Sequence, residues 1–201
     1  MTILGPATPD QRELLKQLIH NEGGRLIDEA TLDRFIDAGE IRKYAPGEAI
    51  TAEGDMDPDV YILMEGILRS WHWDGDVEKT AYFGMPGTLC ISYHSYLMGV
   101  PSPSWHEACC SSTVFRISKR DFDGFRDTSH CFTKWLLSNA QFQLYFFEVK
   151  WNVIQGTARQ RYESLMRNRP EIFRNVQLKT IASYLGVTPQ YLSKLRRSLS
   201  N

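Results

Sequence analysis

The chain has 201 residues, of which 42% are hydrophobic and 23% are charged, and its formal net charge is −1. These values are typical of a globular protein with one large domain or two small ones, and they exclude a disordered chain. No apolar run reaches the ~18 residues of a membrane span, and the N-terminus lacks a secretory signal. A cytoplasmic protein with no membrane partner is therefore expected.

The net charge hides an asymmetry between the two ends of the chain. From Gly156 onward, nine basic and two acidic residues give +7, whereas the 14 basic and 22 acidic residues before it give −8. This split favours a basic C-terminal domain that meets a polyanion, attached to an acidic body that does not.

The four cysteines, Cys90, Cys109, Cys110 and Cys131, include no Cys-x-x-Cys pair. Buried free thiols are favoured over a metal or iron–sulfur site, and we predict neither a metal nor another cofactor.

The first segment, residues 1–130, is expected to fold as a β-roll preceded by helices. One helical pattern starts at Thr8-Pro9-Asp10, and a second is capped by Thr31 and ends before Gly39. From about Ile41, short apolar runs alternate with glycines, which predicts short strands in a small barrel or roll. The stretch VYILMEGILRSWHW, then DGD, then VEKTAYF predicts a β-hairpin that turns at Asp74-Gly75.

The second segment, residues 131–155, is expected to be one long helix with two apolar seams. The members of each seam recur at steps of three and four, and the seams lie about 140° apart. The first seam contains Phe132, Trp135, Asn139, Phe142, Phe146, Val149 and Val153; the second contains Leu137, Ala140, Leu144, Phe147, Trp151 and Ile154.

A helix that is apolar on two faces must bury both of them. We expect one seam to pack on its own β-domain and the other on the same helix of a second chain, which predicts a homodimer. The sequence leaves open which seam faces the partner. Asn139 would then occupy an a-type position and pair across the two-fold axis. The alternative is a central helix that is buried within one subunit.

The third segment, residues 156–201, is expected to end in two short helices joined by a tight turn. A helix in ARQRYESLMRN should stop at Arg169-Pro170, because proline disfavours helix at the preceding residue. In the stretch that follows, Gly186 suits the bend, Thr188 an N-cap and Pro189 a first helical turn. The inner positions are all apolar or small: Leu178, Ile181, Ala182, Leu185, Val187, Leu192 and Leu195. This pattern predicts a helix-turn-helix.

The second helix of this pair has a polar and basic outer face, and no acid occurs from Val187 to Asn201. Such side chains suit base edges and phosphates, and a helix fits the major groove. The predicted DNA-binding residues are Thr188, Pro189, Gln190, Ser193, Lys194, Arg196 and Arg197. The alternative is an αα-hairpin that serves only for packing.

This order of segments resembles the Crp/Fnr family of bacterial transcription regulators over essentially the whole chain. The stretch YAPGEAITAEGDMDPDVYILMEGILRSW is similar to the opening of that family's cyclic-nucleotide domain. TARQRYESLMRNRPEIF and IASYLGVTPQYLSKLR resemble a Bacteroidetes-type branch. The resemblance implies an α+β fold with an N-terminal cyclic-nucleotide-binding-like β-roll, a long dimerisation helix and a C-terminal helix-turn-helix.

The chain departs from the family in its recognition helix. Where the family has an Arg-Glu pair and a further Arg four residues after the Glu, this chain has Pro189, Gln190 and Lys194. Arg forks onto guanine, whereas Gln suits adenine and Lys is a point charge. The family's usual operator is therefore not expected.

The ligand cassette departs further. Ile91-Ser92 stands where the nucleotide-binding members have Gly-Glu, Ser104 or Trp105 stands near their Arg, and no Lys or Arg occurs between Lys79 and Arg116. Because a buried phosphate needs charged or N–H partners, cyclic AMP is not the expected effector. A neutral or apolar small-molecule effector would be lined by Tyr93, His94, Tyr96, Trp105 and His106. The alternative is that these five residues only complete the core.

The sequence thus predicts a sequence-specific dimeric DNA-binding transcription regulator, and not an enzyme. Its expected partners are double-stranded DNA, a second copy of the chain, and an effector, with RNA polymerase as a further candidate. One alternative is a protein-binding sensor dimer whose last helices dock on polymerase or another regulator. A less favoured one is a cupin-like enzyme with His72, His94 and His106 as metal ligands, although no HxH or HxxxH spacing joins them.

Overall fold

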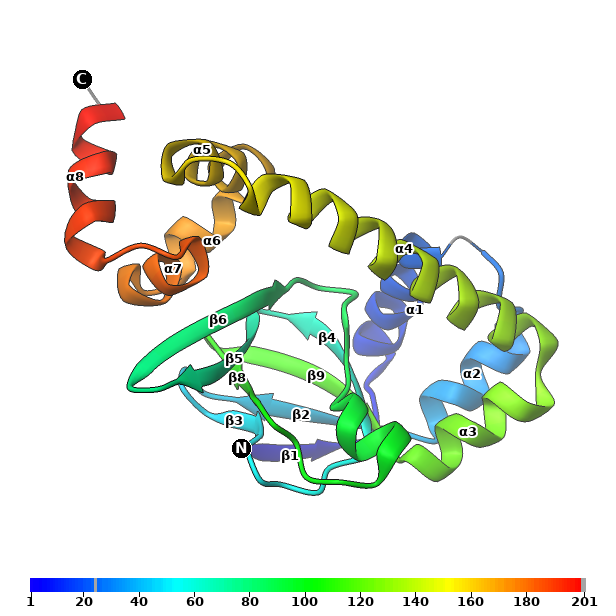
Figure 1. The fold of residues 1–201 in the computed structure, drawn as a ribbon. Coiled ribbons are helices and arrows are strands. Elements are labelled where there is room, and N and C mark those ends of the chain that lie inside the picture. The colour runs from blue at the N-terminus through cyan, green and yellow to red at the C-terminus, as the bar shows by residue number, and fades with distance from the viewer. Residues whose placement is uncertain (24, 200–201) are drawn as a thin grey trace.

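The computed structural model describes residues 1–23 and 25–199, with side chains described throughout except at residues 22–23 and 150–154. A two-sheet β-roll flanked by helices is followed by a long helix and then by a group of short helices at the C-terminal end (Figure 1). This is the mixed helix and sheet fold that the sequence predicts.

Two antiparallel sheets form the β-roll, with strand orders β1-β2-β9-β4-β7 and β3-β8-β5-β6. The strands are β1 (Thr2–Gly5), β2 (Glu40–Tyr44), β3 (Ala49–Thr51), β4 (Val60–Glu65), β5 (Leu68–Asp74), β6 (Val77–Gly84), β7 (Leu89–Cys90), β8 (Trp105–Ala108) and β9 (Ser112–Ile117). The sequence does not predict β1, because its residues are mostly exposed and it becomes a strand only by pairing with β2.

The five-stranded sheet is buried on both of its faces. On β4, Val60 and Ile62 belong to the core beneath the helices, whereas Tyr61 and Leu63 meet Leu68 of the other sheet inside the roll. Successive side chains of a strand point to opposite faces, so one strand supplies two cores. A continuous apolar run such as VYILM follows from this arrangement.

The predicted hairpin arm from Val60 to Trp73 is two strands in different sheets, and this corrects the prediction. Gly66 separates them with φ +97, and a Cβ at this position would lie 2.2 Å from Ser112 Oγ. Only glycine meets both conditions without strain. The turn at Asp74-Gly75 is confirmed, since it joins β5 to β6.

Helices cover the outer face of the five-stranded sheet. They are α1 (Pro9–Gly23), α2 (Glu29–Asp37), α3 (Lys119–Thr128) and the first part of α4 (His130–Ile154). The N-cap of α2 is Asp28, whose carboxylate accepts a hydrogen bond from Thr31 N at 2.9 Å. The prediction of Thr31 as the cap is therefore wrong, because an earlier and stronger cap residue is present.

The first turns of α4 are buried in the chain's own helical core. The ring of Phe132 lies 5.1 Å from that of Phe35, and Trp135 Nε1 donates to Ile19 O at 3.2 Å. Asn139 is only 3% exposed and donates from Nδ2 to Trp135 O at 3.3 Å. The predicted pairing of Asn139 across a two-fold axis is thus contradicted, because its side chain faces its own domain.

Beyond Asn139, the described side chains of α4 are exposed. All side chains from Ala140 to Val149 are exposed, including Phe142 and Phe146 of the first seam and Leu144 and Phe147 of the second. Val153, Trp151 and Ile154 lie outside the described side chains. The first seam is therefore buried in its own chain as far as Asn139 and is exposed from Phe142 to Val149.

Four short helices, which we call the head, follow α4: α5 (Ala158–Asn168), α6 (Pro170–Asn175), α7 (Leu178–Leu185) and α8 (Pro189–Leu199). α5 starts with a capping box between Thr157 and Gln160 and ends before Arg169, as predicted. The sequence does not predict α6, whose first residue is Pro170, the proline that terminates α5. Among the described residues, no helix is apolar and long enough to cross a membrane.

Candidate functional site

The turn between α7 and α8 has the caps that the sequence predicts. Gly186 ends α7 in the left-handed region with φ 65, and Val187 N donates to Ala182 O at 3.0 Å. Thr188 Oγ1 accepts from Tyr191 N at 3.1 Å, and Pro189 is the first residue of α8. These local contacts fix the angle at which α8 leaves α7.

The inner faces of α7 and α8 share one core. Ile181, Ala182, Leu185 and Leu192 are each at most 2% exposed. Arg161 on α5 strengthens the arrangement, because its Nε donates to Leu185 O at 3.0 Å and its Nη1 to Gly156 O at 2.7 Å. One arginine thus joins the end of α7 to the junction that follows α4.

The outer face of α8 points away from the rest of the molecule. Figure 1 shows α8 on the side of the head that is farthest from the roll. Six of the seven predicted DNA-binding residues are exposed, namely Thr188, Pro189, Gln190, Lys194, Arg196 and Arg197, and Ser193 is partly exposed. The sequence reasoning missed Tyr191, which is 48% exposed beside them. Its place directly after Gln190 on the helix was the available signal.

The five predicted effector residues do not surround one cavity, which corrects the prediction. Tyr93 and His94 are exposed. Tyr96 turns toward α3, where its hydroxyl donates to Asp123 and its ring lies 3.9 Å from Lys119 Nζ. This orientation follows from the single helical turn His94–Met98, which lays Tyr96 on the helical core.

Trp105 and His106 are neighbours on β8 and therefore point to opposite faces of the sheet. Trp105 stacks on Trp71 outside the roll, with ring centroids 5.4 Å apart. His106 lies inside the roll, opposite Ser70. Of the five residues, His106 is buried in the roll interior, and the hydroxyl of Tyr93, which is 57% exposed, lies near the interior residues Tyr82 and Cys90.

A small polar group surrounds His106 inside the roll. Tyr82 Oη is 3.4 Å from His106 Nδ1, and the Tyr82 hydroxyl also interacts with the Cys90 thiol. Burial lowers the pKa of His106 to about 4 and raises the pKa of Cys90 to about 12. The group is therefore neutral near pH 7. Ser70, Tyr82 and Cys90 were missed from sequence, because only strand pairing brings them together.

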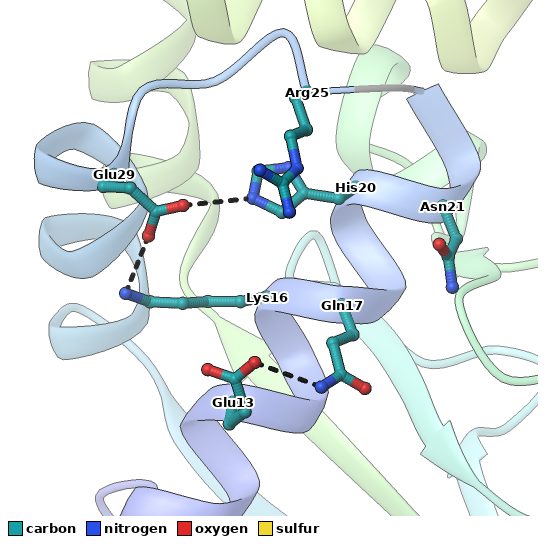
Figure 2. A pocket seen from close by; sticks show the side chains of 7 residues that line it. All are labelled: Glu13, Lys16, Gln17, His20, Asn21, Arg25 and Glu29. Atoms are coloured by element: carbon teal, nitrogen blue, oxygen red, sulfur yellow. Dashed lines mark hydrogen bonds and ion pairs between the residues drawn. The ribbon is translucent and has the colours of Figure 1, made fainter.

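A hollow lies on the surface between α1 and the start of α2 (Figure 2). Its lining mixes both charges: Lys16 Nζ is 3.0 Å from Glu29 Oε2, and His20 Nε2 is 3.4 Å from Glu29 Oε1. Because these groups neutralise one another, we assign this hollow no ligand.

The three histidines proposed as metal ligands in the enzyme alternative do not converge. His72 and His94 are exposed at separate places, whereas His106 is buried. Within the part of the chain that the structure describes, no group of three or more His, Cys, Asp or Glu side chains could hold a metal ion.

The fold of the chain resembles those of known proteins. Residues 41–129 match the cyclic nucleotide-binding domain family. FixK2 from Bradyrhizobium japonicum superposes with a TM-score of 0.68 at 18% identity, over 81% of this chain and 84% of that one. A CooA mutant from Carboxydothermus hydrogenoformans gives 0.66 at 15% identity, over 91% and 84%. No curated protein matches the chain by sequence.

Residues 41–129 thus have the fold of a cyclic nucleotide-binding domain. A putative cAMP-binding regulatory protein from Silicibacter pomeroyi shares this fold with a TM-score of 0.62 and 18% identity, over 94% of this chain and 88% of that one. The likeness extends beyond the roll and includes the long helix and much of the head in its coverage. At these identities the likeness concerns the fold.

The described groups around His106 include no cationic side chain for a cyclic phosphate. Ile91 and Ser92 are at most 7% exposed, and neither supplies a charge. The described neighbours of His106 are neutral, and Arg116 is already paired with Asp59. A cyclic phosphate brought into this interior would lose its hydration without gaining a cationic partner, which costs several kcal/mol.

Acid should destabilise the protein through His106. The unfolded side chain binds a proton below about pH 6.5 and the folded one only below about pH 4, so stability falls as the pH drops between these values. The full loss is roughly 3 kcal/mol. The free energy of unfolding, measured in urea at a series of pH values, should therefore depend less steeply on pH for His106→Gln than for wild type. His72→Gln, at an exposed position, is the control; equal slopes in all three proteins would contradict the prediction.

Proposed function

We propose that this chain is a dimeric, sequence-specific DNA-binding regulator whose roll senses an effector other than a cyclic nucleotide. In this proposal the roll (residues 1–130) is the sensor, the long helix (131–155) forms the dimer, and residues 156–201 form a helix-turn-helix DNA-binding domain. The observation that carries the proposal is the exposed, acid-free outer face of α8 on a capped and buried two-helix frame.

The chemistry of α8 supports duplex DNA as the ligand. Gln190, Lys194 and Arg197 lie at steps of four and three on one exposed face, so a groove of the width of a helix would meet all three. The residues from 156 onward carry +7, which favours a polyanion. An αα-hairpin that served only for packing would not need this face.

The bare section of α4 supports a dimer. Phe142, Phe146 and Phe147 are 47–64% exposed on one short stretch, and water-exposed aromatic surface of this extent marks an interaction site. A second copy of α4 is the economical partner, because a two-fold axis buries the same surface on both chains. The partner-facing surface would then begin after Asn139 rather than at Phe132.

The neutral group around His106 supports an uncharged or weakly polar effector. Ser70, Tyr82 and His106 carry hydrogen-bonding groups without a full charge, and Leu63 and Leu68 are buried in the apolar core of the same roll. Such a lining suits a small neutral molecule. Bound there, it would act on β5, β6 and β8, the strands that carry these residues.

The regulatory protein from Silicibacter pomeroyi among the compared structures favours this function over an enzyme. The protein-binding alternative would use the same α8 face, and DNA binding at low salt distinguishes the two.

Selection of bound fragments from random DNA should return a pseudo-palindrome with half-sites about one helical turn apart. Lys194→Ala and Gln190→Ala should relax base choice at single positions, whereas Arg197→Ala should weaken all sequences alike and reduce the salt slope by about one. Arg174→Ala removes an exposed charge on α6 and serves as control. If the protein retards no DNA in an electrophoretic mobility assay even at low salt, the result favours the protein-binding alternative.

Light scattering at micromolar concentration should give the mass of a dimer. Phe146→Glu should raise the dissociation constant by about two orders of magnitude, because the dimer would bury an unpaired charge twice. Lys134→Glu changes charge at an exposed position nearer the start of α4 and should leave the mass unchanged. A monomeric wild type would remove the dimer from the proposal.

Calorimetry with cyclic AMP and cyclic GMP should show no binding at micromolar ligand. The reason is the missing cationic partner for the phosphate in the roll interior. A cooperative urea transition on the same sample shows that the protein is folded. Micromolar affinity for either nucleotide would overturn this part of the proposal.

A further inference from the structure

The described hydrogen bonds and the ion pair between the head and the roll come from α7 and not from α8. α6 lies beside the roll as well, since Glu171 and Asn175 line a hollow together with Ile67 and Met85. β6 is the edge strand of the four-stranded sheet, so its outward N–H and C=O groups have no strand partner. Ser183 on α7 satisfies two of them: Thr80 N donates to Ser183 Oγ at 2.9 Å, and the hydroxyl donates to Glu78 O at 2.6 Å. Figure 1 shows α7 beside β6.

An ion pair reinforces this contact. Lys179 Nζ, in the first turn of α7, is 3.4 Å from Glu78 Oε1. The other oxygen of Glu78 accepts from Arg69 Nη1 at 3.0 Å. Arg69 is 5% exposed and also bonds both oxygens of Glu107, at 3.2 Å each. Glu78 is therefore held in place by a buried arginine on the outer face of the roll and presented to Lys179.

Apolar side chains complete the contact. Ile67 of the roll belongs to the same buried cluster as the core of the head. Phe83 on β6 lies with its ring 4.9 Å from that of Tyr184 on α7. Cys109 and Cys110 also pack against this cluster. The contact thus combines hydrogen bonds, charge and apolar burial.

This arrangement opposes the approach of DNA. In a helix-turn-helix the first helix crosses the phosphate backbone, so Lys179 at the start of α7 would be a phosphate contact. Here it is engaged by Glu78, and the same hairpin carries Asp74 and Asp76. A phosphate that approached this end of α7 would displace a carboxylate and meet two more.

On the basis of the proposed DNA-binding function, we propose that Ser183 and Lys179 on α7, with Thr80 and Glu78 on β6, form an autoinhibitory latch. The latch holds the head on its own roll, and the roll and DNA compete for α7. Arg69 and Glu107 lie on β5 and β8, next in sequence to the interior residues Ser70 and His106, so a change inside the roll that shifts these strands would move the ion pairs that hold Glu78.

Opening the latch should tighten DNA binding. Apparent affinity is reduced by the fraction of heads that are undocked, so Ser183→Ala and Glu78→Gln should each lower the dissociation constant for a selected DNA site by about threefold to tenfold. Ser164→Ala on α5 is the control for the serine change. Glu40→Gln, an acid that pairs with Arg42 and Arg116 far from the head, is the control for the acid change.

Thiol alkylation measures docking without DNA. Iodoacetamide labelling of Cys109 and Cys110, followed by mass spectrometry, should be several-fold faster in Ser183→Ala and Glu78→Gln than in wild type, because undocking uncovers these thiols. Cys90, inside the roll, should stay slow in every variant and so reports that the roll remains folded. Adding a selected DNA to wild type should also speed labelling of Cys109 and Cys110.

The outcomes separate this inference from the function on which it rests. Faster labelling together with tighter DNA binding supports the latch. Unchanged or weaker DNA binding in the two variants overturns the latch but leaves the DNA-binding function standing. Slower labelling of wild type on DNA also overturns it, because the docked head would then be the DNA-bound one. Loss of DNA binding in wild type and every variant overturns both.

Discussion

The burial of one end of α4 determines most of what this protein presents to its surroundings. Phe132 and Trp135 are locked into the aromatic core around Phe35, so the helix leaves the roll in a fixed direction. Because a helix is stiff over this length, the point at which the head joins α4 and the exposure of the apolar stretch from Ala140 follow from that anchor. A substitution that leaves a cavity at Phe132 would therefore destabilise the packing that anchors α4 on the roll.

The five-stranded sheet explains how one small domain has both a rigid core and a polar interior. Its helix-facing side is filled with Ile, Phe and Leu side chains, whereas its other side closes on a roll that contains Ser70, Tyr82 and His106. The apolar side provides the burial that stabilises the domain. On the other side, burial lowers the pKa of His106 strongly, as expected of an interior that disfavours charged groups.

The head combines local rigidity with a conditional attachment. Its two last helices are fixed by caps and by a shared apolar core, so α8 moves with α7 as one body. Its contact with β6 depends instead on one hydroxyl, one exposed ion pair and a modest apolar patch. Interactions of that size are easily outweighed by a ligand that prefers another state. This difference in strength favours regulation at the contact between α7 and β6 rather than within the head.

The sequence by itself determined the features that depend on neighbours along the chain. The caps at Thr188 and Gly186, the stop at Pro170 and the apolar period of α7 and α8 need only a few adjacent residues, and these elements are confirmed. Tertiary structure decided which face each strand residue takes and which part of α4 is buried in its own chain. In the folded chain Trp105 and Tyr96 lie away from His106, and Asn139 is buried in its own domain. Ser183 bonds to Thr80, which is 103 positions away in the sequence. The physical reason is that caps and turns are satisfied locally, whereas burial and strand pairing depend on groups that only the folded chain brings together.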